Sequence, residues 1–298
     1  MKVPFLDLKS SYLELKDDID KSISRVLTSG SYVLGKELDL FESEWAEYCQ
    51  SKNCVGVGNG LDALILSLKV SNIGEGDEVI VPGHTFIATW LAISAVGAIP
   101  VPIEPNKETF NIDFQLISEK ISRNTKAIIA VHLYGLPANL DQLNQIAIEN
   151  NLILIEDAAQ AHGAFYKNKR IGSHSDLVCW SFYPGKNLGC FGDGGAITTN
   201  NKELSEKLKV LRNYGSEKKY IHKIKGINSR LDPIQAAILR VKLKHLDFWN
   251  NRRRAIAEQY KSLINNQKII TPYFPIDMKS SHHLFVIKCS FRDELIEY

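Results

Sequence analysis

Short apolar runs alternate with amphipathic segments through the first two thirds of the chain, and this alternation constrains the fold more than any other feature. The runs that predict strands lie at 54–57, 78–81, 99–103, 126–131 and 152–155, with helical segments between them. Parallel strands need a crossover, usually a helix, so the pattern predicts an α/β fold with a mostly parallel sheet covered by helices on both faces. Ligands of such sheets bind outside the carboxyl ends of the strands, where candidate site residues are therefore expected.

A glycine-rich loop with a single lysine follows these repeats. Its sequence, SFYPGKNLGCFGDGG, covers residues 181–195, between an apolar run at 177–182 and another at 196–199. Glycine lets the backbone approach a ligand closely, and a lysine shielded from water loses its proton more easily. A neutral lysine amine can attack a carbonyl group and form a Schiff base. Lys186 is therefore a candidate nucleophile, and a solvated loop lysine is the alternative that the residue type alone favours.

Two further groups of residues follow predicted strands. The sequence GVGNGLDAL at 56–64 leads from a strand through a glycine turn into a helix, whose free N–H groups and dipole favour a phosphate. Glu156 and Asp157 follow the strand at 152–155, and only one of them can face a given pocket because successive side chains point to opposite faces. A carboxylate there could pair with a protonated pyridine nitrogen, as pyridoxal phosphate (PLP) requires, or cap the following turn. Ser181 is a candidate phosphate donor.

Composition and motifs exclude several other classes of protein. The chain has 298 residues with 36 Lys and Arg against 34 Asp and Glu, so it lacks the basic excess of a nucleic-acid-binding protein. Neither the five cysteines nor the histidines have metal-ligand spacing, and no metal is expected. Leu61 stands where a dinucleotide-binding G-x-G-x-x-G would have glycine, which counts against a nicotinamide reductase. The N-terminus resembles no signal peptide, and prolines and glycines interrupt the apolar stretch 79–103, so a cytoplasmic protein with no membrane partner is expected.

The pattern changes beyond the lysine loop. A helix is predicted at 202–213, and a long helix from Pro233 toward Leu263 is expected to lead into a second domain. The apolar stretch HHLFVIKCSF at 282–291 predicts a strand close to the end of the chain.

Together the motifs resemble those of the DegT-type nucleotide-sugar aminotransferases, which are PLP-dependent enzymes of fold type I. The matching stretches span almost the whole chain in order and include SGSYVLGKELDLFE (29–42), VPGHTFIAT (81–89), IEDAAQAHGA (155–164), SFYPGKNLG (181–189) and NSRLDPIQAA (228–237). The resemblance implies a PLP-dependent transferase fold of type I, with a large cofactor-binding domain at 1–240. It also implies that 241–298 is the start of a small C-terminal domain, which is expected to be incomplete because relatives run further. The N-terminal segment is expected to pack with the small domain.

The resemblance implies a role for each candidate residue. Lys186 is expected to form the Schiff base with PLP and to move the proton during transamination, and Asp157, rather than Glu156, to pair with the pyridine nitrogen. The other expected cofactor contacts are Gly60, Leu61 and Ser181 to the phosphate, Phe86 to the ring, Gln160 near the phenolic oxygen, and Asn228 from a second subunit. Tyr183 and His162 are expected to contact the substrate.

The implied reaction moves an amino group, with glutamate as the expected donor and pyridoxamine phosphate as the intermediate form of the cofactor, to a keto group of a nucleotide-linked 6-deoxyhexose. The forms NGLDAL and SFYPGKNLG are similar to the branch that aminates carbon 3 of dTDP-linked 3-keto sugars. A homodimer with shared active sites is expected, serving surface-polysaccharide synthesis. Two alternatives are a sugar dehydratase, against which Lys186 counts because such relatives carry histidine there, and a non-catalytic or regulatory relative.

Overall fold

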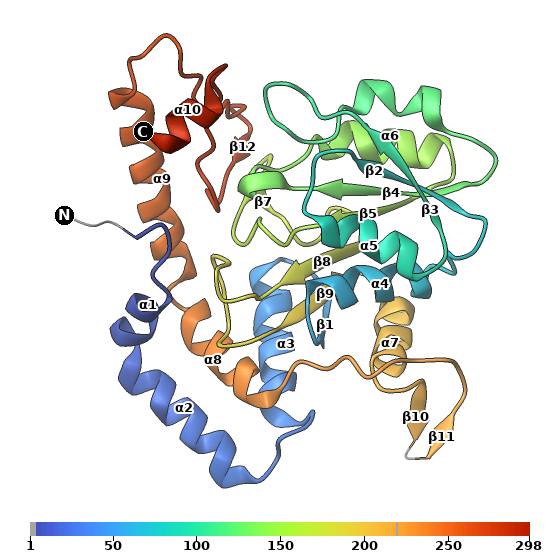
Figure 1. The fold of residues 1–298 in the computed structure, drawn as a ribbon. Helices are drawn as coiled ribbons and strands as arrows, with labels where there is room; N and C mark the ends of the chain where they lie inside the picture. Colours follow the sequence, from blue (N-terminus) through green and yellow to red (C-terminus); the bar gives the residue numbers. More distant parts are fainter. Residues whose placement is uncertain (1–3, 219) are drawn as a thin grey trace.

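A seven-stranded sheet forms the centre of the computed structural model, which describes residues 4–218 and 220–298; residues 1–3 and 219 of the predicted large domain lie outside it. The strand order is β1-β9-β8-β5-β4-β2-β3 (Figure 1). The strands are β1 (Asn53–Val57), β2 (Glu78–Pro82), β3 (Ile99–Ile103), β4 (Thr125–Val131), β5 (Ile153–Asp157), β8 (Leu177–Ser181) and β9 (Gly195–Thr199). Strand β9 pairs antiparallel with β1 and β8, and the other pairs are parallel. The predicted mostly parallel sheet is confirmed.

Helices cover both faces of this sheet. One face packs against α4 (Gly60–Val70), α5 (Ile87–Ala95) and α7 (Lys202–Leu211), and the other against α3 (Lys36–Tyr48), α6 (Leu140–Glu149) and α8 (Pro233–Leu243). In β8, Cys179 is buried in the first of these layers and Trp180 in the second. The strands read as continuous apolar runs because both of their faces are buried.

The N-terminal helices α1 (Leu8–Glu14) and α2 (Lys16–Ser29) lie beside α8 and the helix that follows it, α9 (Leu246–Leu263) (Figure 1). Leu15, Ile19 and Ile238 form a small buried cluster between α2 and α8. The single long helix predicted from Pro233 is wrong, since the chain forms α8 and then α9 (Leu246–Leu263). The break is a tight turn in which the N–H of His245 donates to the carbonyl of Lys242, at 3.0 Å.

Short elements complete the described chain. They are the 3₁₀ turns η1 (Phe114–Leu116), η2 (Ser118–Lys120) and η3 (Leu133–Gly135), the small sheet of β6 (Phe165–Tyr166), β7 (Lys169–Arg170) and β12 (Met278–Lys279), the hairpin of β10 (Ser216–Lys218) and β11 (Ile221–His222), and α10 (Arg292–Glu297). The strand predicted at 282–291 is wrong, because this stretch makes only an isolated bridge, between Ile270 and Lys288. In the part of the chain that the structure describes, no helix is long and apolar enough to cross a membrane.

Candidate active site

The predicted cofactor residues gather at one edge of the sheet. Asp157 ends β5, Ser181 ends β8, Gly60 begins α4 after β1, and Phe86 precedes α5 after β2. These strands run in the same direction, so their carboxyl ends meet at this edge.

Lys186 lies in a tight turn after β8, where its backbone N–H donates to the carbonyl of Tyr183, at 2.8 Å. Burial lowers the pKa of Lys186, and the negative charge of Asp157 partly opposes this effect. A lowered pKa increases the fraction of neutral amine, the form that can act as a nucleophile or accept a proton.

Asp157 is nearly buried, and both of its carboxylate oxygens are held. Oδ2 accepts a hydrogen bond from the hydroxyl of Thr89, at 2.9 Å, and Oδ1 from the backbone N–H of Ala159, at 3.1 Å. Thr89 lies in the stretch 81–89 that carries the family resemblance, but the sequence alone did not single it out.

Glu156, the other candidate carboxylate, points to the opposite face of β5. Its Oε2 lies 2.8 Å from Nε2 of His132, and both side chains are fully buried. The Nδ1 atom of His132 accepts from the N–H of Ala138, so Nε2 carries the proton and donates it to Glu156. Burial alone would raise the pKa of Glu156, but the hydrogen bond from His132 outweighs burial and holds the pKa below its usual range. Asp157 is thus the carboxylate left on the side of Lys186.

The start of α4 forms a cradle with the end of β8. The side chain of Asn59 caps the helix by accepting from the N–H of Asp62, at 2.8 Å, which leaves the N–H groups of Gly60 and Leu61 free of capping. A Cβ atom at Gly60 would lie 2.6 Å from Cβ of Ser181, so only glycine allows this approach. Free N–H groups at a helix N-terminus beside a hydroxyl are the donors that a phosphate needs. The cradle, a shielded amine and a held carboxylate together fit the phosphate, aldehyde and pyridine nitrogen of PLP.

Gln160 is oriented by a backbone group. Its Oε1 accepts from the N–H of Tyr134, at 2.6 Å, so its amide N–H groups are the ones left for a ligand. The hydroxyl of Tyr134 lies 3.0 Å from Nε2 of His84, which follows β2. Tyr134 and His84 were not predicted as site residues; His84 lies in the stretch 81–89 that carries the family resemblance, but the sequence alone did not single out either residue.

The remaining predicted residues differ in exposure. Phe86 and Tyr183 are 69% and 56% exposed, and Asn228 is exposed at an isolated bridge with Asn213. His162 is fully buried, with its ring 5.3 Å from that of Trp180. The structure therefore does not bring His162 to the surface with the others, and its role as a substrate contact stays a prediction.

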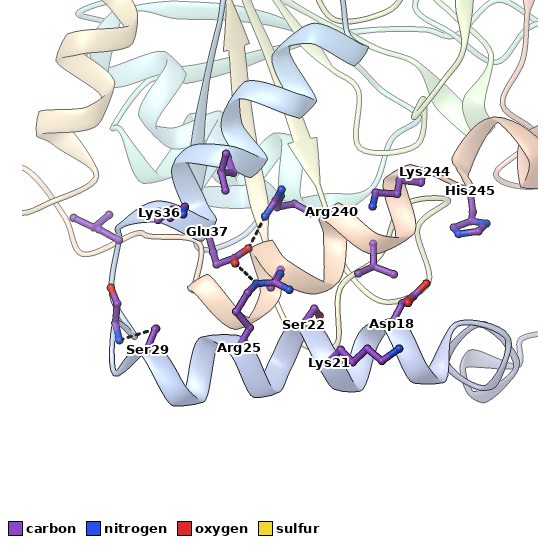
Figure 2. A pocket seen from close by; sticks show the side chains of 15 residues that line it. Asp18, Lys21, Ser22, Arg25, Ser29, Lys36, Glu37, Arg240, Lys244 and His245 are labelled. Carbon is purple, nitrogen blue, oxygen red and sulfur yellow. Dashed lines mark hydrogen bonds and ion pairs between the residues drawn. The ribbon is translucent and has the colours of Figure 1, made fainter.

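A cavity of about 710 Å³ lies elsewhere, between α2, α3 and α8 (Figure 2). Glu37 crosses it to Arg25 and Arg240, at 2.6 and 2.7 Å, and Lys21 and Lys36 also line it. None of the predicted site residues lines this cavity. Over residues 4–218 and 220–298, no group of three or more His, Cys, Asp or Glu side chains could hold a metal ion.

The fold and this arrangement are those of a type I aminotransferase. The chain belongs to the DegT/DnrJ/EryC1/StrS aminotransferase family, whose model matches residues 13–298. It is 53% identical to the dTDP-3-amino-3,4,6-trideoxy-alpha-D-glucose transaminase of Streptomyces venezuelae, over 99% of this chain and 78% of that one. It is also 53% identical to the dTDP-3-amino-3,6-dideoxy-alpha-D-galactopyranose transaminase of Aneurinibacillus thermoaerophilus, over 99% and 82% of the two chains.

Solved structures agree with this assignment. The crystal structure of S. venezuelae DesV in complex with a ketimine intermediate is 53% identical, with a TM-score of 0.97 over 99% of this chain and 80% of that one. Other structures similar to this chain are PLP and pyridoxamine phosphate (PMP) forms of a sugar aminotransferase from Streptococcus pneumoniae. The predicted family, fold type, enzyme class and cofactor are confirmed.

Proposed function

We propose that this protein uses PLP to transfer an amino group from glutamate to the C3 keto group of a dTDP-linked 6-deoxyhexose. The observation that carries the proposal is the meeting of Lys186, Asp157 and the cradle at Gly60 at one edge of the sheet. This arrangement occurs in a chain that matches two dTDP-3-amino-sugar transaminases over 99% of its length. The choice of donor rests on the family resemblance alone.

We assign the cofactor contacts as the sequence predicts them. Gly60, Leu61 and Ser181 bind the phosphate, Phe86 covers the ring, Gln160 donates to the phenolic oxygen, and Asp157 faces the pyridine nitrogen. When bound, PLP supplies an electron sink for the negative charge that develops beside the amino nitrogen. The carboxylate of Asp157 favours the protonated ring, because an opposite charge stabilises the pyridinium.

Lys186 holds and moves the proton in this proposal. Its lowered pKa increases the fraction of neutral amine, which is the form that can accept a proton as a general base must. Tyr183, three residues earlier in the same loop, is exposed and is assigned to the sugar side of the site, together with His162.

We further propose a homodimer in which Asn228 completes the site of the partner. The support is the exposure of Phe86, Tyr183 and Asn228, which leaves the assigned site open to solvent in one chain. We propose that residues 1–240 form the large domain and that residues 241–298 belong to a smaller second domain. All five cysteines are free thiols, which supports the proposed cytoplasmic location because disulfides are rare there.

Borohydride reduction of the PLP-loaded protein, followed by peptide mapping, tests the attachment residue. We expect label on the peptide that contains Lys186. Lys242 is the matched control, because burial also lowers its pKa, to about 8. Lys242→Met should keep the label and Lys186→Ala should lose it.

The substrate is tested with glutamate and a dTDP-linked 3-keto-6-deoxyhexose, with mass spectrometry of the product. We expect exchange of the keto oxygen for an amino group, and a lower kcat/KM with the corresponding UDP-linked sugar. Labelling of Lys186 without turnover of any keto sugar would favour the non-catalytic alternative. No labelling of Lys186 would contradict the proposal that the protein binds PLP through Lys186 and acts as an aminotransferase.

A further inference from the structure

Asn187, the residue after Lys186, is held by three hydrogen-bond partners inside the protein. Its Nδ2 lies 2.8 Å from Oδ1 of Asn250 in α9 and 2.8 Å from the backbone carbonyl of Ser281. Its Oδ1 lies 3.3 Å from Nδ1 of His283. The side chain is 6% exposed, so all of its polar atoms depend on these partners.

Two backbone carbonyls fix the orientation of the amides. The carbonyl of Ser281 can only accept, so the Asn187 atom that faces it must be the NH₂ group. Nδ2 of Asn250 likewise donates to the carbonyl of His162, at 2.8 Å, which turns Oδ1 of Asn250 toward Asn187. Both hydrogens of Asn187 Nδ2 are used, and its Oδ1 is left to face His283.

This orientation determines where His283 carries its proton. Oδ1 of Asn187 can only accept a hydrogen bond, so Nδ1 of His283 must be the donor. Burial, with the nearby charges of Lys186 and of Arg253 in α9, lowers the pKa of His283 to about 3. The ring is therefore neutral near pH 7, and its Nε2 carries a lone pair.

The segment that carries His283 is seated against the assigned site. The hydroxyl of Ser281 donates to the carbonyl of Gln160, at 2.9 Å, and the N–H of Leu284 donates to the carbonyl of Tyr134, at 3.4 Å. A Cβ atom at Gly135 would lie 2.4 Å from Oγ of Ser281 and 3.0 Å from N of His283, so the two backbones approach closely. The segment of His283 is thus packed against the backbone of Gln160 and Tyr134, while its ring contacts Asn187, the residue after Lys186.

We propose that His283 is a substrate-binding residue, held by Asn187 as the neutral Nδ1–H tautomer so that Nε2 accepts a hydrogen bond from the bound substrate. Asn187 is then a positioning residue, since it acts through His283. The proposal rests on the proposed function, because it assumes a substrate with hydroxyl or amino donors beside Lys186. It adds to the site a residue from the segment after α9, which sequence analysis assigned to a strand.

The tautomer is tested by NMR of the protein labelled with ¹⁵N-histidine, without substrate. A His283→Gln sample identifies the two ring signals of His283, since they are the pair that disappears. We expect a protonated Nδ1 and an unprotonated Nε2 throughout the range from about pH 5 to 8. A protonated Nε2, or a charged ring in this range, would overturn the proposal. The NMR measurement does not depend on turnover, so it can contradict the tautomer proposal even if the proposed enzyme activity is found.

Two variants of His283 separate the role of Nε2 as a hydrogen-bond acceptor from the contact between Nδ1 and Asn187. His283→Asn can still donate to Asn187 but has no atom at the place of Nε2, whereas His283→Gln puts an oxygen acceptor near that place. We expect His283→Asn to raise the KM for the keto sugar about tenfold, and His283→Gln to stay within about threefold of the wild type. Both should keep borohydride labelling of Lys186. A wild-type KM in His283→Asn, or equal losses in the two variants, contradicts the role of Nε2.

Discussion

Gly60 and Ser181 lie so close together that a Cβ atom on Gly60 would stand 2.6 Å from that of Ser181. The first turn of α4 is therefore pressed against the end of β8 without room for a side chain. Since the N–H groups of this turn and the hydroxyl of Ser181 are assigned to the phosphate, their closeness sets the shape of the cradle.

Gly60→Ala should weaken cofactor binding. The methyl group must push α4 and β8 apart, which we expect to raise the Kd for PLP about tenfold and to cost about 1–3 kcal/mol of unfolding free energy. Titration with PLP and denaturant unfolding measure the two effects. Gly74→Ala is the control, because a Cβ there meets its nearest atom at 3.6 Å. Wild-type affinity in Gly60→Ala would show that the phosphate lies elsewhere.

Thr89→Val should reduce turnover while leaving the cofactor attached. The change keeps the volume of the side chain but removes the hydrogen bond that holds Oδ2 of Asp157. We expect kcat to fall about tenfold, the effect of one misaligned charged group. Thr85→Val is the matched control, since the hydroxyl of Thr85 contacts that of Thr89 and not Asp157. Equal kcat values in the two variants would mean that this bond does not orient Asp157.

Asp157→Asn should lower the pKa of Lys186 further. Burial already lowers it, and the negative charge of Asp157 opposes that effect by stabilising the ammonium. Without this charge the neutral amine persists to lower pH. The pH dependence of Lys186 acylation in cofactor-free protein measures the shift, and its midpoint should move to lower pH. Glu156→Gln, on the opposite face of β5, should leave the midpoint unchanged, and an upward shift in Asp157→Asn would refute the coupling.

The pair of Glu156 and His132 should make stability depend on pH in the acid range. The pKa of Glu156 is lower in the folded protein than its ordinary value of 4.5, so its stabilisation is complete above that pH and is lost as the pH falls below it. Glu156→Gln cannot titrate, and we expect it to be less stable than the wild type by about 1–3 kcal/mol at pH 6. This difference in unfolding free energy should shrink below pH 4.5. A difference that grows with acid would contradict the direction of the shift.

The sheet could be predicted because its strands are buried on both faces. The predicted runs at 54–57 and 78–81 fall within β1 and β2, whose side chains are buried under helices on both faces of the sheet. The stretch at 282–291 is equally apolar but finds no neighbouring strand, only the bridge between Ile270 and Lys288. An apolar run indicates that side chains are buried, but it does not indicate whether a neighbouring strand is available for pairing.

The assigned site could be predicted where a residue lies at the end of a strand or in the loop after it. Asp157 ends β5 and Lys186 lies in the loop after β8, and the alternation of side chains limited the choice between Asp157 and Glu156. The contact between Asn187 and His283 could not be predicted, because it depends on the chain returning to the lysine loop after α9. No local pattern in the sequence encodes that return.

Mixing two inactive variants tests whether the sites are shared between subunits. Lys186→Ala and Asn228→Ala damage groups that we place in one site but on different chains. If the sites are shared, a mixed dimer carries one site with both defects and one intact site. Random exchange should then restore about a quarter of wild-type activity.

The control for this mixing uses two defects that we place on the same chain. Lys186→Ala mixed with Asp157→Asn leaves one defect in each site of the mixed dimer, so activity should not return. Recovery in the first mixture and not in the second would support a site that Asn228 of one chain completes for the other. If subunits exchange, as native mass spectrometry can verify, but neither mixture recovers, each site is built from a single chain.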